Sequence, residues 1–335
     1  MIQEAITQLV EGKDLSYEAA EECMDEIMNG EADQIQMASY LTALRMKGES
    51  IDEIAASADG MRKHATRLRH DMDVLEIVGT GGDEAYSFNI STMAGIVAAA
   101  AGIPVAKHGN RSVSSKCGAA DVLEALGVNI AIEPERMEKV LRKEGISFMF
   151  AQIYHKAMRY VAPVRKELGI RTIFNILGPL SNPAFANMQL MGVYEEALLK
   201  PMAEVLMKLG VKRGMVVYGT DRLDEISISA PTLVCEIKDG KIQSYEITPE
   251  QFGLKRAKKE DMAGGDPAEN ARITKAILAG EKGAKADAVV LNAGAGIYIA
   301  GKADSLAEGI KKAQEIIDSG RAAEKLEAFI RATNA

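Results

Sequence analysis

The first part of the chain, residues 1–65, carries hydrophobic positions at helical spacing and no strand-like alternation. Apolar residues within 2–10 and within 20–28 recur every three to four positions, which is typical of one buried helix face. Ser50 and Glu53 have the spacing of a capping box just before a further apolar stretch. The pattern therefore predicts a small domain built of helices alone.

From about residue 74 the pattern changes to short apolar runs that alternate with amphipathic stretches. The runs predict strands at 75–78, 103–106, 148–150, 190–194, 215–218 and 226–229. The amphipathic stretches predict helices from 91 onward, through 122–126, and at 134–144, 196–209, 267–280 and 305–318. Such alternation predicts a mostly parallel sheet covered on both faces. Around Asp239-Gly240, the runs 234–237 and 242–247 predict instead an antiparallel hairpin. The predicted fold class is α/β: a small all-helical domain followed by a larger α/β domain with a central, mostly parallel sheet.

The composition narrows the range of partners. The chain has 335 residues and a formal net charge of −8, which opposes general nucleic-acid binding because that requires clustered cations against phosphates. Aromatic residues make up 5% and Trp is missing, which disfavours stacking on nucleobases. The three cysteines form no CxxC pair, so we expect reduced thiols in the cytoplasm. No signal peptide and no run long enough to cross a bilayer is visible, so neither membrane nor nucleic acid is an expected partner.

A glycine-rich segment, Gly79-Thr80-Gly81-Gly82-Asp83, directly follows the first predicted strand. Glycines tolerate positive φ and let successive backbone N–H groups point toward one anion. A helix that begins near Ser91 would add its positive N-terminal end. The spacing matches neither GxxxxGK[ST] nor GxGxxG, which argues against a nucleoside triphosphate or dinucleotide. The segment indicates a different phosphate site, with a tight turn that binds nothing as the alternative.

A second polar loop, residues 107–116, follows the next predicted strand. Its sequence, Lys-His-Gly-Asn-Arg-Ser-Val-Ser-Ser-Lys, is dense in donors for phosphate and ribose oxygens. A solvated loop is the alternative, but it does not explain the position at the carboxyl end of a parallel strand, where open α/β sheets bind ligands. Two such loops after neighbouring strands predict a ligand with two phosphate groups.

Adjacent carboxylates at Asp224 and Glu225 are suited to Mg²⁺, a cation that takes one or two carboxylates together with phosphate oxygens. Acidic pairs are also common on surfaces, and only the two phosphate loops favour the metal. The planar fork of Arg165 suits a small carboxylate, with a surface salt bridge to Glu167 as the alternative. His155 would orient an aromatic acid, or serve as a structural histidine.

Together these motifs resemble the anthranilate phosphoribosyltransferase family, in the order Gly79–Asp83, Asn89–Thr92, 107–115, 171–183 (RTIFNILGPLSNP) and Asp224-Glu225. The resemblance covers essentially the whole chain. It implies a nucleoside phosphorylase-like fold in which residues 1–65 and about 165–187 form the helical domain, and 74–164 and 188–335 the α/β domain. It also implies a homodimer formed through the helical domain.

The activity that the resemblance implies is transfer of the phosphoribosyl group of 5-phosphoribosyl 1-pyrophosphate (PRPP) to anthranilate. The products would be N-(5-phosphoribosyl)anthranilate and pyrophosphate, in tryptophan biosynthesis. Two Mg²⁺ ions would bind, one through Ser91 and one through Asp224 and Glu225. Lys107 and Arg165 would act by positioning and charge stabilisation, with no strong general base.

The remaining implied roles concern substrate binding. The anthranilate channel would be lined by Asn110, His155, Arg165 and Gly178. The PRPP site would comprise Gly79, Gly82, Asp83, Ser87, Asn89, Ile90, Ser91, Thr92, Lys107, His108, Gly109, Asn110, Arg111, Ser112, Val113, Ser114, Ser115 and Ala119. At position 119 many members of the family have Ser, so this chain lacks one hydroxyl there.

Two other functions fit the same fold. A pyrimidine nucleoside phosphorylase attacks the same ribose carbon with phosphate, but Arg165, Asn110 and the Asp224-Glu225 pair disfavour it. A non-catalytic relative that binds nucleic acid would need a basic groove, which the net charge of −8 disfavours.

Overall fold

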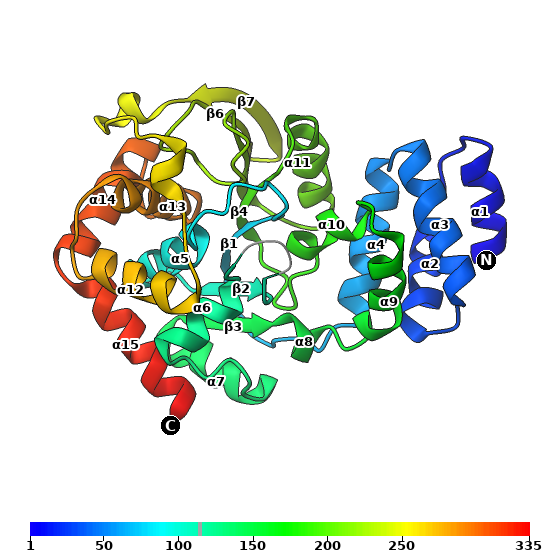
Figure 1. Cartoon of the computed structure of the whole chain (residues 1–335), viewed down its shortest axis with the longest axis horizontal. Coiled ribbons are helices and arrows are strands. Elements are labelled where there is room, and N and C mark those ends of the chain that lie inside the picture. The colour runs from blue at the N-terminus through cyan, green and yellow to red at the C-terminus, as the bar shows by residue number, and fades with distance from the viewer. Residues whose placement is uncertain (113–115) are drawn as a thin grey trace.

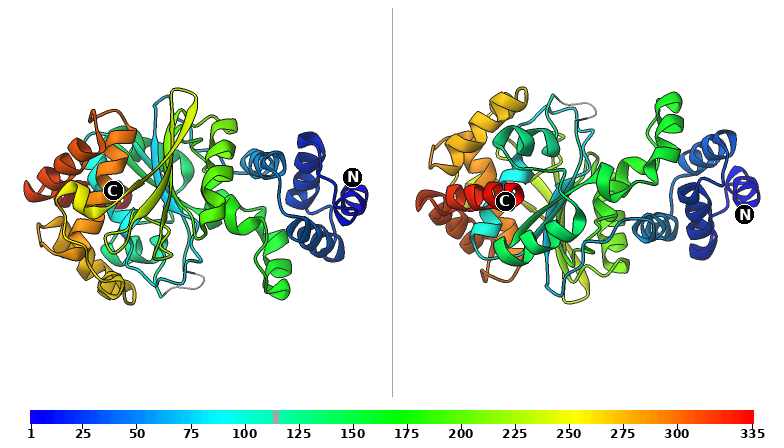
Figure 2. Two further views of the ribbon diagram at one scale, coloured as in Figure 1. Left: turned by 90° about the horizontal axis from the view of Figure 1, so that it is seen from above. Right: turned by 90° about the horizontal axis from the view of Figure 1, so that it is seen from below.

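The computed structural model describes residues 1–112 and 116–335 and has two parts of unequal size (Figure 1). The expected ligand contacts of Val113, Ser114 and Ser115 lie outside the described residues. The smaller part contains the N-terminus and consists of helices, and the larger part is built around a sheet (Figure 2). Within the described residues, no helix combines the length and the apolar composition that a membrane crossing requires.

The smaller part contains the four N-terminal helices, α1 (Ile2–Val10), α2 (Tyr17–Asn29), α3 (Gln34–Lys47) and α4 (Ile51–Lys63). The predicted capping box is formed at the start of α4, where Ser50 and Glu53 each accept the other's backbone N–H. A later helix, α9 (Met158–Leu168), packs against α2 and α3. The bundle therefore includes a segment that lies far along the chain from its other helices.

The larger part contains a seven-stranded sheet with the order β3-β2-β1-β4-β5-β6-β7. The first five strands pair in parallel and the last two antiparallel, which confirms the predicted fold class and the hairpin. The strands are β1 (Leu75–Gly79), β2 (Val105–Gly109), β3 (Ile146–Phe150), β4 (Met188–Gly192), β5 (Arg213–Gly219), β6 (Thr232–Lys238) and β7 (Lys241–Ile247).

Helices cover both faces of the sheet, as the alternating pattern predicts. One hydrophobic cluster joins the sheet to α5 (Ile90–Ala100), α13 (Ala284–Ile299), α14 (Leu306–Asp318) and α15 (Arg321–Asn334). A second cluster joins the opposite face to α11 (Leu199–Lys208) and the helical bundle. Figure 2 shows the C-terminal helices and the bundle on opposite sides of the sheet. The remaining helices are α6 (Ala119–Leu126), α7 (Pro134–Glu144), α8 (Ala151–Tyr154), α10 (Phe174–Leu177) and α12 (Pro267–Leu278).

The predicted strand at Ile226–Ser229 is wrong, because this segment is an irregular buried loop. Side chains bond several of its backbone groups, and the Ile228 carbonyl oxygen accepts the N–H of Ala257, which is not in a strand. Asn292 on α13 accepts the N–H of Ile226 and donates to its carbonyl oxygen, and Ser227 Oγ accepts the N–H groups of Ser229 and Ala230. The apolar residues are buried as a strand would bury them, but no ladder is needed.

Candidate active site

Two glycines end the neighbouring strands β1 and β4, and the loop that carries Asp224 lies against both. Gly79 and Gly192 are partners in the β1–β4 ladder. A Cβ on Gly79 would lie 2.2 Å from Asp224 Oδ2, and a Cβ on Gly192 would lie 1.6 Å from the Asp224 carbonyl oxygen. Both positions therefore require glycine, and the close approach places Asp224 over the carboxyl ends of two central strands.

The adjacent carboxylates of Asp224 and Glu225 are both buried, each with 8% of its surface exposed. Asp224 Oδ2 accepts the N–H of Gly81 at 2.7 Å, and Glu225 Oε1 accepts the N–H of Ser91 at 3.1 Å. The backbone N–H of Asp224 points to Asp83 Oδ2 at 3.4 Å. The two carboxylates are therefore held between the glycine-rich loop and the start of α5.

Burial and mutual repulsion shift the acidity of this pair. Burial, together with the charges of Asp83 and Glu225, raises the pKa of Asp224 well above its usual range. Burial raises the pKa of Glu225 to about 7, although Lys107 and the Ser91 N–H oppose the shift. The buried carboxylates of Asp224 and Glu225 are suited to bind a divalent cation, which would relieve the repulsion between them. Among the described residues no three Asp, Glu, His or Cys side chains form a cage for a metal.

Lys107 brings a buried cation to the same place from β2. Its ammonium group donates to the Ile77 carbonyl oxygen at 2.7 Å and to Ser91 Oγ at 3.2 Å. Burial lowers its pKa, while the carboxylates of Glu225, Glu76 and Asp224 act in the opposite direction. The Lys107 side chain is thus aimed at the start of α5, between the two predicted phosphate loops.

The glycine-rich loop 79–83 turns away from the sheet with the expected backbone geometry. Gly81 and Gly82 have φ values of 69° and 74°, the region that favours glycine. Both glycines are exposed, and the guanidinium of Arg171 donates to the Gly82 carbonyl oxygen at 2.6 Å. The loop is therefore tethered at one carbonyl group, and part of it remains accessible to a ligand.

The loop after β2 is tied to α6 by Asp121, which accepts the N–H groups of Ser112 and Gly118, each at 2.9 Å. Arg111 pairs with both Asp121 and Glu124 at 2.9 Å. Its guanidinium therefore already has two carboxylate partners on α6. Asn110 is exposed, and its carbonyl oxygen accepts the N–H of Ala120.

The other positions expected to contact PRPP surround these groups. Asn89, before α5, donates to the Cys117 carbonyl oxygen and accepts from Asn270 on α12. The Thr92 hydroxyl is buried without a hydrogen-bond partner among the described residues. Four further expected positions are partly or fully buried, namely Ser87, Ile90, Gly109 and Ala119.

Two histidine rings lie against each other beside the sheet. The ring centroids of His108 and His155 are 4.9 Å apart. Burial lowers the pKa of His108 well below its usual range and that of His155 to about 4, so both rings are neutral at pH 7. A hydrogen bond with the backbone of Gly178 opposes the shift of His108. Both Nε2 atoms are buried without a hydrogen-bond partner among the described residues.

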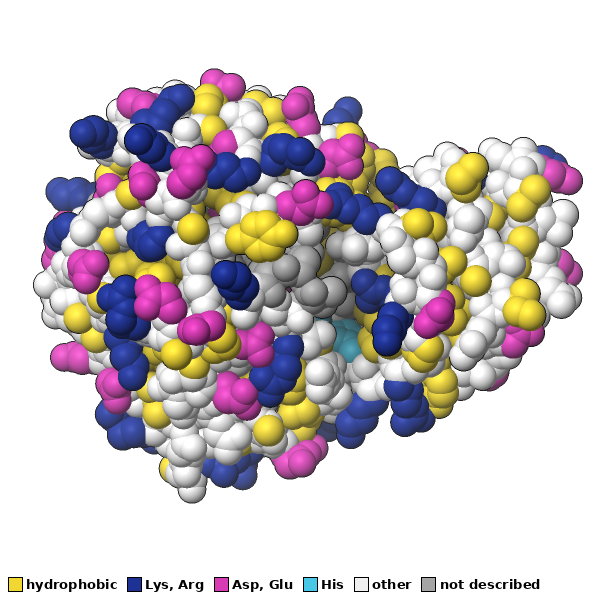
Figure 3. Space-filling view, in the orientation of Figure 1, with side chains coloured by type: hydrophobic (Ala, Val, Ile, Leu, Met, Phe, Trp, Pro, Cys, Tyr) yellow, Lys and Arg dark blue, Asp and Glu magenta, His cyan; other side chains and the backbone are white. Residues whose placement is uncertain are grey.

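Arg165 on α9 has no acidic partner among the described residues, so the alternative salt bridge with Glu167 is not formed there. Its guanidinium carbon lies 5.5 Å from the centre of the Phe174 ring. Burial lowers its pKa. Figure 3 shows Lys and Arg side chains and a histidine around a hollow between the two parts of the molecule.

Three residues near the expected site had no role assigned from the sequence, namely Glu76, Arg171 and Asn182, although the last two lie within the 171–183 motif. Glu76 lies within a strand and is fully buried, where an apolar side chain is normal. Burial raises its pKa to about 7 against the effects of Asn182, the His108 N–H, Lys107 and Arg62. The signal in the sequence that could have identified Glu76 is its charge within an apolar strand, where a buried charged residue is rare.

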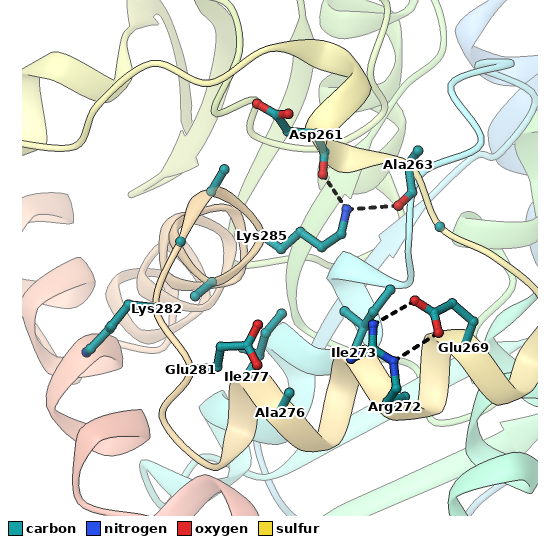
Figure 4. A pocket seen from close by; sticks show the side chains of 14 residues that line it. Asp261, Ala263, Glu269, Arg272, Ile273, Ala276, Ile277, Glu281, Lys282 and Lys285 are labelled. Carbon is teal, nitrogen blue, oxygen red and sulfur yellow. Dashed lines mark hydrogen bonds and ion pairs between the residues drawn. The ribbon is translucent and has the colours of Figure 1, made fainter.

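A pocket of about 390 Å³ lies elsewhere, between α12 and the start of α13 (Figure 4). Several of its charged groups already have partners. Lys285 donates to the carbonyl oxygens of Asp261 and Ala263, and Arg272 pairs with Glu269. None of the predicted site residues lines it, so we assign the chemistry to the strand ends.

Comparison with known proteins supports that assignment. Residues 3–65 match a glycosyl transferase family helical bundle domain, and residues 71–323 match a glycosyl transferase family a/b domain. A protein of Lachnoclostridium phytofermentans named anthranilate phosphoribosyltransferase is 67% identical, over 100% of this chain and 99% of that one. One of Methanobrevibacter smithii with the same name is 61% identical over the full length of both.

Solved structures agree in fold over nearly the whole chain. The anthranilate phosphoribosyltransferase of Thermus thermophilus superposes with a TM-score of 0.94 at 48% identity, covering 99% of each chain. The enzyme of Saccharomyces cerevisiae, solved in complex with PRPP and Mg, superposes with a TM-score of 0.92 at 29% identity, covering 99% of this chain and 98% of that one. The motifs, the fold and the full-length similarity agree, and the chain belongs to the anthranilate phosphoribosyltransferase family.

Proposed function

We propose that the protein transfers the phosphoribosyl group of PRPP to anthranilate, with release of pyrophosphate, in tryptophan biosynthesis. One observation carries the proposal: the glycine loop, the buried Asp224-Glu225 pair and Lys107 converge where β1, β2 and β4 end. Relatives up to 67% identical over the whole chain bear the name of this activity.

The overall reaction is tested by mixing the protein with anthranilate, PRPP and Mg²⁺ and following anthranilate fluorescence. We expect the fluorescence to fall with time and the fall to stop on addition of EDTA. Turnover of thymidine with phosphate, in place of this reaction, would support the nucleoside phosphorylase alternative.

The donor is proposed to bind with its phosphate groups between the glycine loop and the loop after β2. Asp224 and Glu225 would hold one Mg²⁺, and Ser91 would contribute to a second. Bound Mg²⁺ supplies positive charge where the leaving pyrophosphate gathers negative charge. Lys107 and the N–H groups of residues 79–83 would add to this stabilisation, which is the main source of acceleration when charge develops on a leaving group.

The acceptor is proposed to lie beside His108, His155 and Gly178, with its carboxylate toward Arg165. The amine nitrogen forms a bond to the anomeric carbon as the bond from that carbon to the pyrophosphate oxygen breaks, and the amine loses a proton to solvent. Anthranilate's amine is a nucleophile without prior deprotonation, so orientation contributes more than a strong base. The two histidine rings are buried and neutral, and such rings can pack against the aromatic ring of the acceptor.

Replacing Arg165 with alanine is expected to raise the KM for anthranilate at least on the order of tenfold and leave the KM for PRPP nearly unchanged. A lost charge-assisted, bidentate contact accounts for an effect of that size. Steady-state kinetics with each substrate varied in turn measures both constants. Arg159→Ala, the same change elsewhere on α9, serves as the control and should behave as wild type. Equal losses for both substrates would count against the assignment.

The assembly is proposed to be a homodimer formed through the helical bundle. Helix α3 has apolar residues on two faces: Tyr40 and Leu44 are buried, whereas Ile35 and Met46 are 79% and 83% exposed. Ile35 and Met46 are about three helical turns apart and therefore share a face. Val10 on the neighbouring α1 is exposed as well. Several large, highly exposed apolar side chains gathered on one helical face are typical of an interface.

The double substitution Ile35→Glu with Met46→Glu is expected to convert the protein to a monomer, because it buries two charges without partners in the interface. Light scattering after size-exclusion chromatography measures the mass. Ile170→Glu, which changes an exposed apolar residue outside the helical bundle's α3 face, should leave the dimer intact. A monomeric wild-type protein would refute the assignment.

We further propose that residues 1–65 and about 165–187 move together as one domain, and that the protein works in the cytoplasm. The domain proposal is supported by shared packing: Ile173, Phe174, Ile176 and Leu177 belong to the same hydrophobic cluster as α1 to α4. Helix α9, most of which precedes residue 165, packs against α2 and α3 as well. The location is supported by three buried thiols without disulfides.

A further inference from the structure

The parallel strands β1 and β2 separate just before the predicted donor site. Among the described residues, Leu75 and Val105 are the one pair of ladder partners between these strands, whereas β1 pairs with β4 along all five of its residues. The N–H of Leu75 donates to the Pro104 carbonyl oxygen. Continuing that parallel ladder would join the Ile77 N–H to the Ala106 carbonyl oxygen, and the His108 N–H to the Ile77 carbonyl oxygen.

Side chains occupy three of the four backbone groups that this ladder would use. The Ala106 carbonyl oxygen accepts from the Asn182 side chain at 2.9 Å. The His108 N–H donates to Glu76 Oε1 at 3.1 Å. The Ile77 carbonyl oxygen accepts from the Lys107 ammonium group at 2.7 Å. Glu76, Asn182 and Lys107 thus replace the missing ladder and satisfy the buried backbone.

These contacts depend on one another. Because the His108 N–H is directed to Glu76, the Ile77 carbonyl oxygen does not share its lone pairs with that N–H and accepts the Lys107 ammonium group. The same carboxylate places a negative charge near the Lys107 ammonium group within the buried strands, and a buried cation is costly without such a charge. Arg62 on α4 also lies close enough to act on Glu76 electrostatically. Its guanidinium donates to the Leu180 carbonyl oxygen and is held there.

We propose that Glu76 is a positioning residue for PRPP binding, which holds β1 and β2 apart and thereby fixes the Lys107 ammonium group toward the donor phosphates. The proposal rests on the proposed function. Glu76 is not a catalytic residue, since it acts through Lys107 and His108. Asn182 supports the same separation by holding the Ala106 carbonyl oxygen on the edge of β2 that faces β1.

Two substitutions distinguish the effect of the hydrogen bond between His108 and Glu76 from the effect of the Glu76 charge. Glu76→Leu removes the acceptor, so the His108 N–H can return to the Ile77 carbonyl oxygen and compete with Lys107. We expect kcat/KM for PRPP to fall on the order of 100-fold, the usual loss when one fixed electrostatic donor is displaced. Glu76→Gln keeps an oxygen for the His108 N–H and removes only the charge, so it should rescue about tenfold of that loss. In both variants the KM for anthranilate should stay near wild type.

Ser147→Ala is the matched control, because Ser147 on β3 is buried and its hydroxyl donates to the carbonyl oxygen of Val105 on the other side of β2. It should leave both KM values unchanged. Titration calorimetry of PRPP with Mg²⁺ gives a second readout that does not depend on turnover, and the order of affinity should be wild type, Glu76→Gln, Glu76→Leu.

Equal losses for both substrates, or no rescue by Glu76→Gln, would overturn the proposal and leave Glu76 with a structural role. If Glu76→Leu does not fold, Glu76→Gln decides: a raised KM for PRPP alone supports the proposal and wild-type constants refute it. The proposed function fails separately, when the wild-type protein does not consume anthranilate with PRPP and Mg²⁺.

Discussion

Replacing Asp224 with asparagine is expected to lower kcat/KM for PRPP on the order of 1,000-fold. Asparagine has nearly the same shape and still offers an oxygen to the Gly81 N–H, which lies 2.7 Å from the carboxylate. The substitution therefore removes a charge and leaves the local hydrogen bonding. If Asp224 holds Mg²⁺ as proposed, losing its charge costs at least as much as losing one fixed hydrogen-bond donor, which reduces rates by roughly 100- to 1,000-fold.

Initial rates across a Mg²⁺ titration test this expectation, because the variant should also require more Mg²⁺ for half-maximal rate. Asp239→Asn makes the same chemical change in the exposed β6–β7 turn and should leave rates and Mg²⁺ dependence unaltered. A variant at position 224 with wild-type rates would remove the metal site from the proposed function.

The same substitution should stabilise the protein in the absence of ligands. The folded-state pKa of Asp224 is raised by burial and by the charges of Asp83 and Glu225. A carboxyl group with a raised pKa favours folding while protonated, and that contribution is lost as the pH rises past the usual carboxyl range. At pH 7 to 8 the ligand-free wild type should therefore melt at a lower temperature than Asp224→Asn. Buried carboxylates that are suited to bind a cation lower the stability of the ligand-free protein, which is a common cost of an active site.

The sequence was sufficient for the fold class because helical spacing in 1–65 and the strand–helix alternation after residue 74 are strong local signals. The prediction from sequence failed where side chains, and not a neighbouring strand, form the hydrogen bonds to the backbone. Ile226–Ser229 has a strand's apolar residues, yet Asn292 on a distant helix satisfies its backbone. Helix α13 was not predicted because it is buried on nearly every side beyond its first turn and so has only a weak amphipathic period.

In the candidate site, too, some features were predictable from the sequence and others were not. Its loops were predicted because glycines and clustered donors after strands are conspicuous in a sequence. The residues that hold those loops were not predicted. Glu76 and Asn182 bind backbone groups of β2, and such contacts become apparent only when the positions of the strands are known. The pairing of Arg111 with Asp121 and Glu124 likewise depends on how α6 returns over the loop, which no local pattern encodes.

Gly192→Ala is expected to abolish measurable transfer, a loss of at least 1,000-fold by analogy with removal of a whole electrostatic contact. The added Cβ would lie 1.6 Å from the carbonyl oxygen of Asp224 and 2.2 Å from its carbonyl carbon. Those atoms are backbone, so no rotamer change relieves the clash, and the 224–225 loop must move away from the strand ends. Both carboxylates proposed to hold Mg²⁺ would move with it, although neither has been altered chemically.

Gly95→Ala provides the matched control for this last change. Its Cβ would meet only Val105 Cγ1, at an ordinary 3.5 Å, inside α5, and alanine favours a helix by about 1 kcal/mol over glycine. Transfer rates and circular dichroism should therefore be retained in Gly95→Ala, while Gly192→Ala should keep its helical signal and lose both activity and Mg²⁺-dependent PRPP binding. Retained transfer in Gly192→Ala would mean that the 224–225 loop need not lie against the ends of β1 and β4 during turnover. The carboxylates would then be free to reach the donor from another position, and the geometry on which the metal site rests would have to be abandoned.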